Sequence, residues 1–138
     1  MNFSKPVTYA IRALTHLARA GNKSPVLSST IAHEESLPAP YLIKVMGTLT
    51  TNGMVVATRG RGGGFSLAVS PQKINLYDIF ILFEGLSLTR DCLLGLGTCG
   101  EVEHCPVHAR WGEPKGHVEN FLRTTTIADL AAMKDSVE

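Results

Sequence analysis

The three cysteines of this 138-residue chain lie close together, at positions 92, 99 and 105. They share a glycine-rich stretch, and a histidine follows the last of them. Thiolates gathered in a short loop can converge on one soft metal centre, because sulfur suits iron–sulfur clusters, zinc and cuprous ion. The candidate metal ligands are therefore Cys92, Cys99, Cys105 and His108.

Several other interpretations of this stretch stay open. A zinc ion held by three thiolates and a histidine is chemically sound, although the chain lacks the paired C-x-x-C spacing of common zinc modules. The thiols could also form a switch without any metal, or be inert core residues, which the surrounding glycines disfavour. His104 competes with His108 as a fourth ligand.

The elements that must position these side chains are mainly helical. Apolar residues recur at helical spacing after Ser4, a possible helix cap, and Gly21 supplies a stop. The same reasoning predicts further helices over residues 29–35, 39–52, 76–84 and 108–123, and a short capped helix after residue 126.

The pattern changes between the third and fourth predicted helices. Residues 54–58 and 65–69 favour strands and flank a glycine-rich turn, which predicts a hairpin. Helix, helix, turn, helix and hairpin is the order of a winged helix-turn-helix. We therefore predict a mainly α fold with a small β-hairpin wing, a DNA-binding domain over residues 1–75, and a second part over residues 76–138 that contains the cysteine loop.

The same two parts of the chain differ in net charge. Residues 1–75 carry eight Lys and Arg against two acidic residues, a net charge of +6, whereas residues 76–138 carry five against ten, a net charge of −5. A basic front half joined to an acidic back half favours a polyanion-binding module with a regulatory or assembly segment. No membrane-length apolar run and no secretory leader is present, so we expect a cytoplasmic protein.

The third predicted helix and the hairpin tip carry the candidate DNA contacts. With its apolar stripe packed inward, the helix turns Lys44 toward guanine or phosphate, Tyr41 toward phosphate and Ile43 toward a thymine methyl. Arginines on a glycine-rich tip suit a minor groove, and the glycine spacing matches no nucleotide-binding loop. The predicted DNA-binding residues are Ser28, Ala39, Pro40, Tyr41, Ile43, Lys44, Arg59 and Arg61.

Four stretches of the chain resemble the IscR/NsrR/RirA family of winged-helix, iron–sulfur transcription regulators. They are SKPVTYAIRALTHLA (residues 4–18), LPAPYLIKVMGTLTTNGMV (37–55), RGRGGGFSLA (59–68) and the cysteine loop CLLGLGTCGEVEHCPVH (92–108). The resemblance implies a homodimer on a palindromic operator. It also implies that the helix after the cysteines forms the dimer interface against the partner's first helix.

The resemblance further implies that the loop holds a 2Fe–2S or 4Fe–4S cluster, with His108 as the fourth ligand if the chain follows the IscR type. Six residues separate Cys92 from Cys99, whereas IscR and NsrR types have five and RirA types about seven. Thr8 stands where NsrR-like members can offer an acid from the partner subunit. These departures leave the cluster type and the fourth ligand undecided at this point.

Together, these observations predict a DNA-binding repressor whose operator affinity depends on a cluster that senses nitric oxide, redox stress or iron–sulfur status. The alternatives are a winged-helix regulator with zinc or a thiol switch in the cysteine loop, and a small iron–sulfur redox protein. The redox protein would leave the arginines of the hairpin and the charge split unexplained. No Ser/His/Asp set or paired carboxylates point to catalysis, so we do not expect an enzyme.

Overall fold

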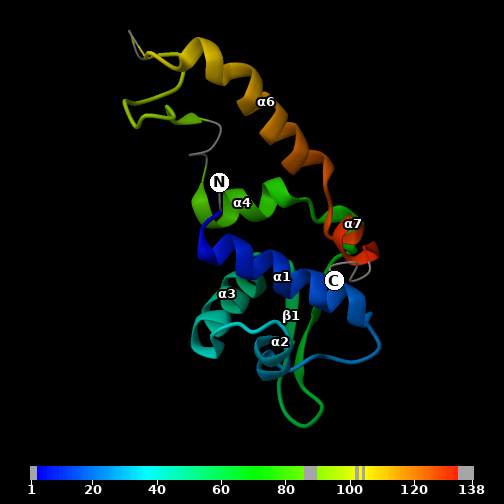
Figure 1. Cartoon of the computed structure of the whole chain (residues 1–138). Helices are drawn as coiled ribbons and strands as arrows, with labels where there is room; N and C mark the ends of the chain where they lie inside the picture. Colours follow the sequence, from blue (N-terminus) through cyan, green and yellow to red (C-terminus); the bar gives the residue numbers. More distant parts are fainter. Residues whose placement is uncertain (1–2, 86–89, 102, 104, 134–138) are drawn as a thin grey trace.

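The computed structural model describes residues 3–85, 90–101, 103 and 105–133, and its fold is mainly helical with one two-stranded antiparallel sheet. The predicted winged-helix class is confirmed (Figure 1). The elements are α1 (Lys5–Ala20), α2 (Ser28–Glu34), α3 (Ala39–Thr51), β1 (Val55–Thr58), β2 (Gly64–Leu67), the 3-10 helix η1 (Pro71–Lys73), α4 (Leu76–Glu84), α6 (His108–Thr124) and α7 (Ile127–Ala132).

One hydrophobic core joins the two ends of the described chain. Helix α1 contributes Leu14 and Leu17, and α3 contributes Met46, all almost completely buried. The same core contains Leu122 near the end of α6 and Ile127 in α7. In Figure 1, α4 and α7 accordingly lie against α1 on the side away from α2. The end of α6 and α7 are thus packed into the same core as the winged helix.

Helix ends follow the local signals in the sequence, with one exception. Asn75 caps α4, since its side-chain oxygen accepts a hydrogen bond of 2.8 Å from the Asp78 amide. Thr126 and Asp129 form a reciprocal capping box at the start of α7. Ser4 does precede α1, but the predicted capping bond is wrong: its hydroxyl is buried and has no hydrogen-bond partner among the described residues.

The wing is anchored by a pairing that the sequence did not reveal. Strand β2 pairs with β1 and also exchanges two backbone hydrogen bonds, of 2.8 and 2.7 Å, between Phe65 and Val26 in the segment before α2. Gly64 lies at this crossing with a φ of +142°. A Cβ atom there would lie 2.5 Å from the Val26 carbonyl group, so only glycine allows the close approach.

Replacing Gly64 with alanine is therefore expected to lower the free energy of unfolding by about 3 kcal/mol, because backbone strain adds to the loss of two hydrogen bonds. Gly62→Ala is the matched control. Gly62 also has a positive φ, +76°, but nothing lies within 4 Å of a Cβ atom built there. For the control we expect the free energy of unfolding to fall by about 1 kcal/mol. Urea unfolding measures both variants. Equal losses for the two variants would refute the proposed close approach.

Helix α6 is the most exposed long element. It runs from the cysteine loop down to α7 and crosses beside α4 (Figure 1). Leu122 is its one buried residue, and the Phe121 side chain is 51% exposed. The helix continues through Pro114. Within the part of the chain that the structure describes, no helix is long and apolar enough to cross a bilayer.

Candidate metal centre and nucleic-acid interface

The first two cysteines lie on a short antiparallel turn, residues 90–99. The amide of Cys92 donates to the Gly97 carbonyl at 2.7 Å, and the amide of Cys99 donates to the Arg90 carbonyl at 2.6 Å. Residues paired across such a turn share a face, and every second residue along one arm returns to that face. Cys92 lies opposite Gly97, so Cys99, two residues on, occupies the same face. The six-residue gap fits this register.

The other two candidate ligands come from the turn that begins α6. The His108 amide donates to the Cys105 carbonyl at 3.3 Å, which keeps the two residues adjacent. Gly100 lies against the imidazole, and a Cβ atom there would be 3.8 Å from the His108 Cε1 atom. The four side chains therefore come from two hydrogen-bonded turns that face each other.

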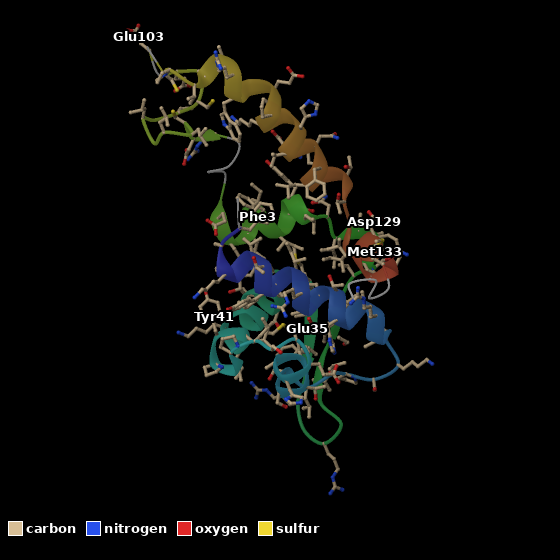
Figure 2. All side chains as sticks on the ribbon, in the orientation of Figure 1. Phe3, Glu35, Tyr41, Glu103, Asp129 and Met133 are labelled. Carbon is tan, nitrogen blue, oxygen red and sulfur yellow. The ribbon has the colours of Figure 1, made fainter. Side chains whose placement is uncertain are left out.

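Each cysteine of the first piece faces one donor of the second. The Sγ atoms of Cys92 and Cys105 are 3.4 Å apart, and the Cys99 Sγ atom is 3.5 Å from Nδ1 of His108. Figure 2 shows sulfur atoms gathered in this loop, near the labelled Glu103. His104, the competing ligand, lies outside the described residues.

The sequence predicted convergence on one centre, but the donors are arranged as two pairs. Among the described residues, no three His, Cys, Asp or Glu side chains are grouped closely enough to hold a single metal ion. Two ligands on one tetrahedral ion lie about 3.3–3.8 Å apart, given metal–ligand bonds of about 2.0–2.3 Å. Each pair thus has close to the spacing of two ligands on one ion.

The environment of Cys92 favours its thiolate form. Its side chain is only 7% exposed, whereas Cys99 and Cys105 are half-buried. Backbone hydrogen bonds lower the pKa of the Cys92 thiol despite its burial. The bond from Leu96 has the largest effect, and the bond from Leu94 the next largest. A thiolate is the form that binds metal and reacts with oxidants.

The predicted DNA contacts occupy two surfaces of the winged helix. The α3 residues Ala39, Pro40, Tyr41, Ile43 and Lys44 are all exposed. Ile43 is 57% exposed, although it is a branched apolar side chain. Tyr41, labelled in Figure 2, lies on the side of α3 next to α1, where its ring meets the Tyr9 ring edge-on with centroids 5.3 Å apart.

The remaining predicted contacts lie on the wing and at the start of α2. Arg59 and Arg61 are exposed at the tip of the hairpin, whereas Ser28 is half-buried. The hairpin tip and the cysteine loop lie at opposite ends of the molecule in Figure 1. The structure thus brings together the α3 residues and, separately, the two arginines.

Sequence reasoning missed an ionic cluster that joins α1 to α2. The His16 ring lies 3.1 Å from a Glu35 carboxylate oxygen and 3.2 Å from one of Glu34. Arg12 pairs with the Glu35 carboxylate at 3.6 Å and donates to its carbonyl oxygen. The available signal was that Arg12 and His16 lie one helical turn apart, while Glu34 and Glu35 are the only acids before residue 76.

Comparisons with known proteins agree with this architecture. The model of the Rrf2 family, described as an iron-dependent transcriptional regulator, matches residues 3–133. A protein of Aquifex aeolicus named as an HTH-type transcriptional regulator is 39% identical over 98% of this chain and 94% of its own length. The HTH-type transcriptional regulator IscR of Vibrio vulnificus is 25% identical over 100% of this chain and 82% of its own length.

Two solved structures share the fold over nearly the whole chain. CymR, the global cysteine regulator of B. subtilis, superposes with a TM-score of 0.82 at 26% identity, covering 98% of this chain and 99% of that one. IscR of T. potens superposes with a TM-score of 0.74 at 28% identity, covering 99% of this chain and 94% of that one. These relatives are regulators rather than enzymes, so the chain is a DNA-binding transcriptional regulator and belongs to the Rrf2 family.

Proposed function

We propose that this regulator is a homodimeric repressor whose affinity for a palindromic operator is set by an iron–sulfur cluster in the cysteine loop. Residues 1–75 would bind the DNA, and residues 76–138 would hold the cluster and the dimer together. The observation that carries the proposal is the pair of soft-donor contacts, Cys92 with Cys105 and Cys99 with His108. The signal would be nitric oxide, redox stress or iron–sulfur status.

The donor set fits a two-iron cluster better than one zinc ion. A single tetrahedral ion needs four donors around one point, whereas a 2Fe–2S cluster needs two protein ligands on each of two irons. Cys92 and Cys105 would serve one iron, and Cys99 and His108 the other. When bound, such a cluster would supply a redox-active centre that also reacts with nitric oxide. The similarity to IscR and the iron-dependent family description support the same assignment.

Helix α6 would connect the ligand loop to the DNA-binding half. The helix begins at His108, and its far end packs through Leu122 into the core that also holds α1 and α3. Fixing the donors would therefore fix the start of a helix that the core already holds at the other end. The resemblance to the IscR/NsrR/RirA family supports α6 as the surface that meets a second copy, and α6 exposes the Phe121 side chain there.

The dimer would set the distance between the two recognition helices. Half-sites on DNA repeat about 34 Å apart, so small rotations about the interface change whether both α3 helices fit the operator. A cation-rich winged half with net charge +6 would supply the general attraction to DNA.

A metal-free thiol sensor is the second candidate function. The 3.4 Å separation between the Cys92 and Cys105 sulfurs is compatible with direct thiol chemistry. The solved oxidized form of Staphylococcus aureus CymR, which is 26% identical to this chain, favours the same class of signal. This candidate predicts operator binding that responds to oxidants but not to iron chelation.

Operator affinity measured without oxygen separates these functions. We expect chelation of iron from the purified protein to change the dissociation constant about 5–150-fold, the usual range of coupling between two sites. A variant with alanine at all three cysteines should match the chelated protein and show no further response. Asn22→Ala, at an exposed position just after α1, is the control that should behave like the unaltered chain. Identical affinity in all four samples would refute cluster control.

A further inference from the structure

The two donor contacts in the cysteine loop differ in what they can do without a metal. Cys92 faces another sulfur at 3.4 Å, whereas Cys99 faces a ring nitrogen at 3.5 Å. Two thiols at van der Waals contact can be oxidised together with little backbone movement, because a disulfide bond is about 2.05 Å long. A thiol beside an imidazole has no such partner.

We propose that in the cluster-free protein Cys92 and Cys105 close a disulfide, while Cys99 stays a reduced thiol. This inference rests on the proposed function, since it gives the cluster-free state of the same loop a defined covalent form. The oxidant is a peroxide. One thiol attacks the peroxide oxygen and becomes a sulfenic acid, releasing water; the second thiol attacks that sulfur, and a second water leaves. Hydrogen peroxide thus takes two electrons and two protons from the pair.

The backbone around the pair supports this choice of partners. Cys92 is fixed by the hydrogen bond between its amide and Gly97, and Cys105 by the turn to His108. The backbone of both cysteines is therefore held by local hydrogen bonds. Oxidation would take one donor from each half of the loop, so the disulfide and a cluster would exclude each other. Reduction would restore the ligand set.

Peptide mapping of the full-length chain tests the pairing. The chain is stripped of iron without oxygen, treated with one equivalent of hydrogen peroxide, and alkylated. Trypsin alone leaves all three cysteines in the peptide of residues 91–110, but further cleavage after Glu101 and Glu103 separates Cys105 from the others. We expect residues 91–101 joined to residues 104–110, with the single alkyl group on Cys99 and a free-thiol count that falls from three to one per chain.

Serine variants supply the matched controls. Cys99→Ser should still form the link, whereas Cys92→Ser and Cys105→Ser should each lose it and retain two alkylated thiols. A bond that includes Cys99, a bond between chains, or three alkylated thiols after peroxide treatment would overturn the proposal. Reconstitution with iron and sulfide in the same preparation keeps the two ideas apart: a disulfide without cluster formation refutes only the proposed function, and a cluster without the disulfide refutes only this inference.

Discussion

Alanine at both Arg59 and Arg61 is expected to weaken operator binding about 100-fold and to reduce the slope of log affinity against log salt concentration by about 2. Both side chains are exposed at the tip of the β1–β2 hairpin. Each arginine that contacts phosphate or enters a minor groove displaces about one bound cation from the DNA. The hairpin pairs residues 55–58 with residues 64–67, outside the two arginines, so its fold should survive the change.

Arg110→Ala is the matched control for the loss of positive charge. Arg110 is also exposed, but it lies on α6, at the end of the molecule far from the hairpin (Figure 1). Fluorescence anisotropy with labelled operator DNA at several salt concentrations gives affinity and slope together. Each single variant should bind the operator about tenfold more weakly, and its slope of log affinity against log salt concentration should fall by about 1. An equal loss in Arg110→Ala would mean that general charge, and not the wing, carries the contact.

The helices could be predicted closely because their signals are local. Gly21 ends α1, Asn75 caps α4 and Thr126 caps α7, each within a few residues of the backbone groups that it satisfies. The contact between Val26 and Phe65 could not be predicted in this way. It joins residues far apart in the sequence, and only the fold brings the wing to that loop.

The sequence could predict that the cysteine and histidine side chains of the loop gather, but it could not predict how they pair. Cysteine spacing indicated which side chains gather, but the pairing depends on the register of residues 90–99. That register is set by backbone hydrogen bonds and by Gly95 and Gly97, whose φ angles are +71° and +134°. The result is two donor pairs instead of one group of four. The His16 cluster was missed for a related reason, since its acids lie on a different helix.

The separation between the cysteine loop and the wing limits how a signal can act. The two lie at opposite ends of one chain, so no loop side chain reaches the hairpin tip directly (Figure 1). Within a chain, one connection runs along α6 to Leu122 and through the core to α1 and α3, and a second runs back along the chain to α4, which packs on α1. Coupling of this kind works by shifting rigid elements between discrete positions. If the proposed cluster and dimer form, we therefore expect the cluster to alter the spacing of the two α3 helices more than the shape of either one.

Replacing His108 with alanine is the sharpest test of the two-iron arrangement. The unaltered chain, reconstituted without oxygen, should hold two iron and two sulfide ions, because each donor pair can serve one iron. Loss of His108 would leave Cys99 as the single side chain available to the second iron of the proposed cluster. Substituting a residue that only hydrogen-bonds to a metal ligand already lowers metal affinity about 10–100-fold. For the loss of a ligand itself we expect iron affinity to fall at least about 100-fold. Iron and sulfide assays with visible absorption measure the effect.

His117→Ala provides the matched control on the same helix, because its imidazole is exposed and pairs only weakly with Glu113, at 3.6 Å. It should keep full iron content and an unchanged spectrum. His108→Cys restores a soft donor at the same backbone position, and we expect it to recover iron binding with a shifted absorption spectrum, since thiolate replaces imidazole on one iron. Full iron and sulfide content in His108→Ala would show that the fourth ligand comes from elsewhere, and the pairing of Cys99 with His108 would then have no role in holding the metal.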